Sequence, residues 1–90
     1  MTQKSTQLAL YYYDTCPFCY RVRSAIEQLG IDVELRNTMS DPTHRADLIS
    51  GGGRGTVPCL QITDPNDDVT WMYESGDIVR YLEREFGQAA

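Results

Sequence analysis

Basic side chains and long apolar runs are both scarce in this 90-residue sequence. Lysine and arginine together number 8 against 13 aspartates and glutamates, and the formal net charge is −5. Because no lysine or arginine cluster is available to contact phosphates, we expect no nucleic acid among the partners. No apolar run is long enough for a membrane span or for a secretory leader. We therefore expect a cytoplasmic protein with no membrane partner.

Cysteine is also scarce, with only three residues, Cys16, Cys19 and Cys59. An odd and low number argues against the disulfide framework of a small secreted domain. The length is that of one small domain, so we expect residues 1–90 to form a single unit with reduced thiols.

The pattern of apolar residues predicts a small α/β domain. Aromatic, β-branched and alternating runs predict four strands, over residues 7–13, 31–37, 56–63 and 68–73. Periodicity and start signals predict three helices, over residues 17–29, 42–50 and 75–86. Asp41 and Ser75 are the expected N-caps of the second and third helices, and "GGGRG" is expected to end the second. The order β-α-β-α-β-β-α matches the thioredoxin fold, a four-stranded mixed sheet with three helices.

Cys16 and Cys19 enclose a Pro-Phe pair at the start of the first predicted helix, in the segment "CPFC". The free N–H groups and the dipole at a helix start favour a thiolate, so Cys16 is the expected nucleophile. Cys19 lies three residues further, on the same helix face, and can form an internal disulfide with Cys16. A CxxC segment in a cytosolic βαβ context is a specific redox signal.

A zinc site is the main alternative for the cysteines. Cys16, Cys19, Cys59 and His44 form a ligand set on paper, but structural zinc sites pair a CxxC with a second closely spaced ligand pair. We therefore expect no metal. Cys59 is instead expected to be a small buried core residue, and His44 a surface residue of the second helix.

Three segments resemble the glutaredoxin family. The segment "CPFC" differs by one hydroxyl from the commonest active-site motif of that family, and "TVP" at 56–58 matches its second signature. The segment "YESGDIVRYLEREFG" is more similar to the thioredoxin-like N-terminal domain of glutathione S-transferases and of transferase-like glutaredoxins. Together these segments extend the resemblance from Leu8 to Gly87.

The resemblance implies a glutathione-dependent thiol-disulfide oxidoreductase, an enzyme that reduces protein–glutathione mixed disulfides and small disulfides. Cys16 would attack the disulfide, and Cys19 or a second glutathione would resolve the intermediate. Glutathione is then a co-substrate, and no cofactor is tightly bound. The implied partners are glutathione and glutathionylated or disulfide-containing proteins, and we expect a monomer.

The resemblance also assigns residues to a glutathione site. It implies that Pro58 is a cis proline, which leaves the backbone of Val57 free to pair with the glutathione peptide. Thr56 opens the same segment. Ser75 is expected to hold the γ-glutamyl carboxylate with its N–H and hydroxyl, or to serve only as an N-cap. Glu74 gives this turn the form found in the transferases.

Five further residues are candidates for the same site. Asp77 can pair the γ-glutamyl ammonium, and Arg54 either pairs the glycine carboxylate or is a solvated loop residue. Phe18 is expected to be half exposed and to pack on the substrate. Many glutaredoxins have a lysine three residues before the first cysteine. This chain has Tyr13 there, as a strand residue or a site residue, and Arg21 is a candidate substitute cation.

Three rival functions remain at this point. A glutathione S-transferase needs a second, helical domain, and this chain ends three residues after Gly87. An iron–sulfur carrier would hold a cluster between two protomers with Cys16 and two glutathiones, which Pro17 disfavours by resemblance. A redoxin that depends on thioredoxin reductase would share the CxxC but lack the "ESGD" segment.

Overall fold

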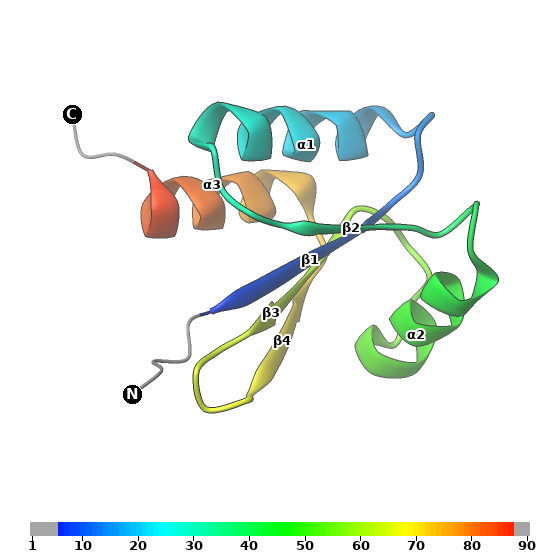
Figure 1. The fold of residues 1–90 in the computed structure, drawn as a ribbon. Coiled ribbons are helices and arrows are strands. Elements are labelled where there is room, and N and C mark those ends of the chain that lie inside the picture. The colour runs from blue at the N-terminus through cyan, green and yellow to red at the C-terminus, as the bar shows by residue number, and fades with distance from the viewer. Residues whose placement is uncertain (1–5, 88–90) are drawn as a thin grey trace.

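A computed structural model describes residues 6–87 as a four-stranded sheet with three helices (Figure 1). The elements are β1 (Gln7–Tyr12), α1 (Pro17–Leu29), β2 (Glu34–Asn37), α2 (Pro42–Gly52), β3 (Cys59–Thr63), β4 (Val69–Met72) and α3 (Ser75–Phe86). The strand order is β2-β1-β3-β4, in which β1 pairs parallel with β2 and antiparallel with β3, and β3 pairs antiparallel with β4. The predicted α/β class, element order and mixed sheet of the thioredoxin fold are confirmed.

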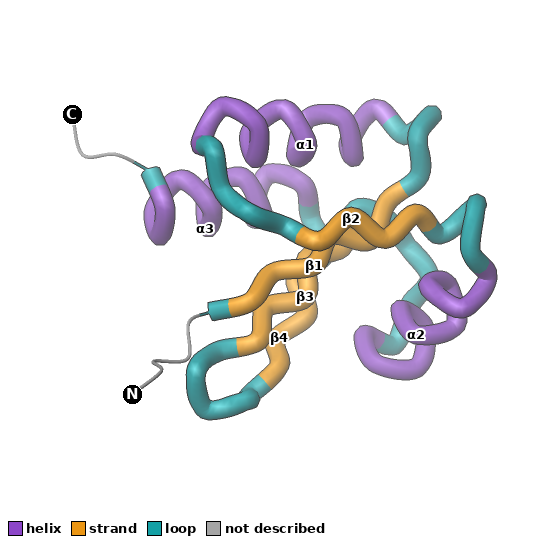
Figure 2. The backbone as a smooth tube through the Cα atoms, in the orientation of Figure 1, coloured by secondary structure: helices purple, strands orange, loops and turns teal. Residues whose placement is uncertain are grey.

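The helices cover the two faces of the sheet unequally (Figures 1 and 2). Helices α1 and α3 lie side by side on one face, and α2 lies on the other. The large core cluster lies between the sheet and the α1/α3 pair. It consists of Leu8, Leu10, Tyr12, Cys16, Cys19, Val22, Leu60, Ile62, Ile78 and Leu82. Both cysteines of the CxxC therefore belong to the main core.

A small core cluster on the α2 face consists of Tyr11, Leu48 and Cys59, all fully buried. Successive strand residues point to opposite faces, which is why Tyr11 packs here and Tyr12 packs in the large core cluster. The prediction that Cys59 is buried is confirmed. His44 lies on α2 as expected, but it is half-buried, because its ring packs edge-on against Tyr11 at 6.5 Å.

The predicted start and end signals hold for α1 and for the beginning of α2. Pro17 opens α1, and Gly30 ends it in the left-handed conformation at φ 66°. The Asp41 side chain accepts the N–H of Thr43 at 2.9 Å, so this N-cap prediction is confirmed. None of the helices within residues 6–87 has both the length and the hydropathy needed to cross a bilayer.

Two helix boundaries differ from the prediction. Helix α2 continues through Gly51 and Gly52 and is capped only by Gly53. The prediction that Ser75 is the N-cap of α3 is wrong. Glu74 takes that position because its C=O accepts the N–H of Ile78 at 2.9 Å, and no side chain caps this helix.

The strands are shorter than the apolar runs that predicted them. Strand β2 begins at Glu34 because its pairing with β1 runs only from Ala9↔Glu34 to Tyr12↔Asn37. Strand β3 begins at Cys59, which pairs with Tyr11. The residues just outside these ladders still contribute to the core, since Ile31, Val33 and Val57 pack against the large core cluster.

Candidate active site

Cys16 is the N-cap of α1. Its backbone is extended, with φ −84° and ψ 115°, and its Sγ accepts the N–H of Cys19 at 3.3 Å. The first N–H groups of a helix have no acceptor within the helix, and a side chain at the N-cap can accept a hydrogen bond from one of them. The sulfur of Cys16 therefore sits where the free N–H groups and the dipole of α1 stabilise negative charge.

Cys19 lies one turn into α1 and is fully buried. Burial and a hydrogen bond with Cys16 raise the pKa of the Cys19 thiol to about 12, although the positive charge of Arg23 acts in the opposite direction. At neutral pH this thiol is protonated. The two cysteines thus differ, because one sulfur faces backbone donors and the other is held as a thiol in the core.

Arg23 is the basic residue of α1 whose charge acts on Cys19, rather than the predicted Arg21, whose side chain is exposed. The Arg23 guanidinium lies 4.8 Å from the centre of the Tyr12 ring and contacts Asp14 at 3.4 Å. A helical position seven residues after Cys16 brings Arg23 back to the face that carries the cysteines.

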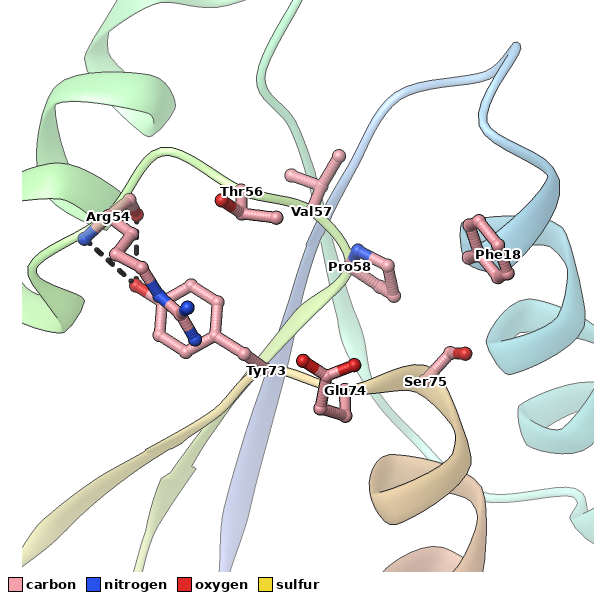
Figure 3. A pocket seen from close by; sticks show the side chains of 8 residues that line it. All are labelled: Phe18, Arg54, Thr56, Val57, Pro58, Tyr73, Glu74 and Ser75. Atoms are coloured by element: carbon pink, nitrogen blue, oxygen red, sulfur yellow. Dashed lines mark hydrogen bonds between the residues drawn. The ribbon is translucent and has the colours of Figure 1, made fainter.

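A cavity of about 250 Å³ opens beside the start of α1 (Figure 3). It is lined by Phe18, Arg54, Thr56, Val57, Pro58, Tyr73, Glu74 and Ser75. These residues come from the first turn of α1, the segment before β3 and the β4–α3 junction. All but Tyr73 belong to the predicted glutathione site, so the fold gathers residues that are up to 57 positions apart, from Phe18 to Ser75.

The segment before β3 forms one wall of the cavity. The Val57–Pro58 peptide bond is cis, as predicted. Within residues 6–87, the N–H and C=O of Val57 make no hydrogen bond. They lie just before the start of β3, where an extended peptide can pair with them as an added strand does.

The start of α3 forms another wall. Ser75 is nearly buried, at 9% exposure, and is the first residue of the helix. Because Ile78 donates the first intrahelical hydrogen bond, the N–H groups of Ser75, Gly76 and Asp77 precede the hydrogen-bonded part of the helix. This end of the cavity therefore offers backbone donors to an anion.

Arg54 and Tyr73 close the opposite end of the cavity (Figure 3). The Tyr73 hydroxyl donates to the C=O of Arg54 at 2.9 Å and accepts its N–H at 3.3 Å. The Arg54 guanidinium lies 4.2 Å from the centre of the Tyr73 ring. Burial raises the pKa of Tyr73, so its hydroxyl remains a hydrogen-bond donor at neutral pH.

The family described as "Glutathione S-transferase, N-terminal domain" matches residues 10–90. The chain belongs to this family. Glutaredoxin 2 of Escherichia coli strain K12 is 35% identical to it over 81 residues, which are 90% of this chain and 35% of the relative. This glutathione S-transferase N-terminal domain thus spans about a third of the length of that curated relative.

Solved structures share the fold. Maleylacetoacetate isomerase from Anaeromyxobacter dehalogenans 2CP-1, solved with glutathione in its active site, superposes with a TM-score of 0.74 at 22% identity. The overlap covers 97% of this chain and 41% of that chain. Glutathione transferase E6 from Drosophila melanogaster gives a TM-score of 0.70 at 26% identity, over 92% of this chain and 36% of that one.

The predicted glutathione-binding residues Asp77 and Tyr13 lie outside the cavity lining, and so do both predicted catalytic cysteines. Asp77 is on the exposed side of α3 and forms an ion pair with Arg80. Tyr13 borders a different cavity of about 350 Å³, together with Asp14, Thr15, Asn37, Met39 and Ser40. The C=O of Tyr13 still accepts the N–H of Cys16 at 3.3 Å, so its backbone helps to fix the position of Cys16.

The cysteines and His44 do not meet as a ligand set. Cys16 and Cys19 lie in the large core cluster, whereas Cys59 lies in the small core cluster on the other face of the sheet. In the part of the chain that the structure describes, no three His, Cys, Asp or Glu side chains are placed to hold a metal ion.

Tyr73 is the lining residue that the sequence prediction missed. The only sequence signal for it is an aromatic residue directly before Glu74. Phe18 was expected to be half exposed and is 62% exposed, with its ring at the mouth of the cavity (Figure 3).

Proposed function

We propose that this domain is a glutathione-dependent thiol-disulfide oxidoreductase that reduces protein–glutathione mixed disulfides and small disulfides. The observation that carries the proposal is the unequal thiol pair at the start of α1. Cys16 Sγ accepts a backbone N–H at the helix N-cap, while the buried Cys19 thiol stays protonated. A nucleophile and a thiol held in reserve are what thiol–disulfide exchange requires.

In the first step, the Cys16 thiolate attacks the glutathione sulfur of a mixed disulfide. A bond forms between Cys16 and glutathione, the bond between glutathione and the substrate protein breaks, and the substrate leaves as a thiolate that takes up a proton from water. The free N–H groups at the start of α1 stabilise the Cys16 thiolate before the attack.

In the second step, the thiolate of another glutathione attacks the sulfur of the bound glutathione. Oxidised glutathione leaves, and Cys16 returns to its thiolate form. The alternative is attack by Cys19 on Cys16, which releases glutathione and forms an internal disulfide. Because burial raises the pKa of the Cys19 thiol, this route first needs the loss of a proton from that thiol.

The cavity supplies a binding mode for glutathione. The peptide pairs with the N–H and C=O of Val57, and the γ-glutamyl carboxylate meets the N–H groups at the start of α3 near Ser75. The glycine carboxylate then lies at the other end of the cavity, near Arg54. Phe18 covers the substrate from the side of α1. In this binding mode Asp77, which forms an ion pair with Arg80, is the candidate partner of the γ-glutamyl ammonium.

Single substitutions of the cysteines test the proposal. Cys16→Ser should abolish deglutathionylation of a mixed disulfide in an assay coupled to glutathione, while Cys19→Ser should retain a large part of it. Equal losses in both variants would contradict the assigned roles, and full activity of Cys16→Ser would refute the proposed reaction.

The reaction is assigned to the cytoplasm, where thiols are kept reduced, with the domain acting as a monomer.

A second candidate follows from the family match. The domain would bind and activate glutathione for transfer to an electrophile within a longer transferase-like protein, as its 35% coverage of the curated relative suggests. Turnover of glutathione with 1-chloro-2,4-dinitrobenzene, in the absence of any disulfide reduction, would favour this candidate.

A further inference from the structure

The hydroxyl of Tyr73 forms hydrogen bonds with both backbone groups of Arg54, a residue of the loop between α2 and β3. The Tyr73 Oη donates to the C=O of Arg54 at 2.9 Å and accepts its N–H at 3.3 Å, and the Arg54 guanidinium lies over the same ring at 4.2 Å. One side chain therefore holds both the backbone and the charged group of Arg54.

The loop that carries Arg54 has little else to fix it. Arg54 stands between Gly53, at φ 92°, and Gly55, and its side chain makes no ion pair with any residue between 6 and 87. Glycine-flanked backbone loses the most conformational entropy when it is ordered. Without the Tyr73 contacts, the guanidinium would sample many positions in solvent.

The preceding helix makes room for this arrangement. A Cβ at Gly52 would lie 2.1 Å from the Tyr73 hydroxyl oxygen, and a Cβ at Gly51 would lie 2.2 Å from the Trp71 ring. Both glycines are inside α2, where alanine would favour the helix by about 1 kcal/mol per residue. The glycine at position 52 therefore lowers the stability of α2 relative to alanine and leaves the space that the Tyr73 hydroxyl occupies beside Arg54.

We propose that Tyr73 is a positioning residue that holds the Arg54 guanidinium at one end of the cavity to bind a carboxylate. This inference rests on the proposed glutathione site and adds its specificity element. A rigid cation at one end and the N–H groups of α3 at the other select ligands that carry two anionic groups at a fixed separation. Glutathione, with a carboxylate at each end, has this chemistry.

Binding of two glutathione derivatives tests the inference. The probes are S-methylglutathione and its ethyl ester at the glycine carboxylate, which differ only in the charge that Arg54 would meet. Affinities are measured by amide chemical-shift titration of the whole domain, so the result does not depend on turnover. The wild-type domain should bind the acid about three- to tenfold more tightly than the ester, the range of one ordinary hydrogen bond, because Arg54 is exposed to solvent.

Tyr73→Phe keeps the ring and removes both hydrogen bonds to Arg54. We expect its affinity for the acid to fall to that for the ester, with ester binding unchanged. Arg54→Ala should give the same result, and adding Tyr73→Phe to it should change nothing further. Tyr81→Phe, on α3 and outside the cavity lining, is the matched control and should keep the wild-type preference.

Three results would overturn the inference. They are equal binding of acid and ester by the wild-type domain, an unchanged preference in Tyr73→Phe, and equal weakening of both probes in that variant. If Tyr73→Phe does not fold, an intact preference in Arg54→Ala overturns it. A wild-type preference for the acid combined with no deglutathionylation would refute the proposed reaction and leave the positioning role standing.

Discussion

Cys16 and Cys19 are three residues apart and both buried in the large core cluster, and yet their sulfurs have different neighbours. Cys16 precedes the helix and its sulfur meets a backbone donor, whereas Cys19 is inside the first turn and fully covered by the large core cluster. Spacing alone predicts that the two can bond, because residues i and i+3 share a helix face. Their difference depends on which neighbours cover Cys19, and these come from distant parts of the chain.

The same reason explains the residues that sequence analysis misplaced. The sequence prediction named Arg21 as the substitute cation, whereas in the structure Arg23 is the one that packs on the Tyr12 ring. Tyr73 was not assigned to the cavity because its partner, Arg54, is 19 residues away in an irregular loop. By contrast, the "TVP" segment has the predicted cis proline and lines the cavity, as do Glu74 and Ser75 of the "ESGD" segment.

Ser75→Ala separates the two roles considered for this residue. Ser75 is not an N-cap and makes no capping hydrogen bond. The free energy of unfolding of the Ser75→Ala variant should therefore differ from that of the wild-type domain by less than about 0.5 kcal/mol. Its affinity for S-methylglutathione should fall by about 0.5–1.5 kcal/mol, the typical value of one hydrogen bond, because the backbone donors remain.

Both quantities can be measured on one sample set, by urea unfolding and by chemical-shift titration. Ser24→Ala on α1, outside the cavity lining, is the control. A loss of stability near 1 kcal/mol with unchanged affinity would show that the hydroxyl serves the helix and not a ligand.

At the scale of elements, α2 shows a local preference overruled by packing. The glycines at 51 and 52 predict a helix end, yet the helix continues through them because the Trp71 and Tyr73 rings fill the space beside them. The element order and helix starts could be predicted, because proline, aspartate and apolar periodicity act within a few residues. The ends of β2 and β3 could not, because they depend on pairing with β1.

Gly51→Ala should destabilise the protein although alanine is the better helix former. The new Cβ would lie 2.2 Å from the Trp71 ring, and relieving such a contact typically costs about 1–3 kcal/mol. Ser50→Ala, at the neighbouring exposed position of the same helix, should be neutral or slightly stabilising.

Urea unfolding of the two variants checks this prediction. Combining Gly51→Ala with Trp71→Leu should recover part of the loss, since the two positions are in contact. A stabilised Gly51→Ala variant would mean that the ring does not constrain this helix.

Across the whole molecule, the sheet separates two buried thiols that titrate late. Burial raises the pKa of Cys19 to about 12 and that of Cys59 to about 11, although a hydrogen bond with Tyr73 opposes the second shift. An unfolded cysteine has a pKa of about 8.5, so above that value the folded chain binds more protons than the unfolded chain. The free energy of unfolding should therefore fall as the pH rises from about 8.5 towards 12.

Urea unfolding at pH 7 and pH 10.5, under reducing conditions, measures this loss. Each buried thiol contributes a slope of at most about 1.4 kcal/mol per pH unit. Cys19→Ala and Cys59→Ala should each be less stable at pH 7 and should each lose less stability on the alkaline side. Slopes identical to the wild-type slope would show that neither thiol stays protonated in the folded state.

The position of Trp71 gives the protein a built-in optical probe. It is the only tryptophan of the sequence, its ring lies 5.5 Å from that of Tyr11, and it packs against α2 at Gly51. Its fluorescence therefore reports on the surroundings of the small core cluster, against which its ring packs. Loosening of α2 can thus be followed by emission, with no attached dye, on the side of the sheet opposite to the core that holds Cys16 and Cys19.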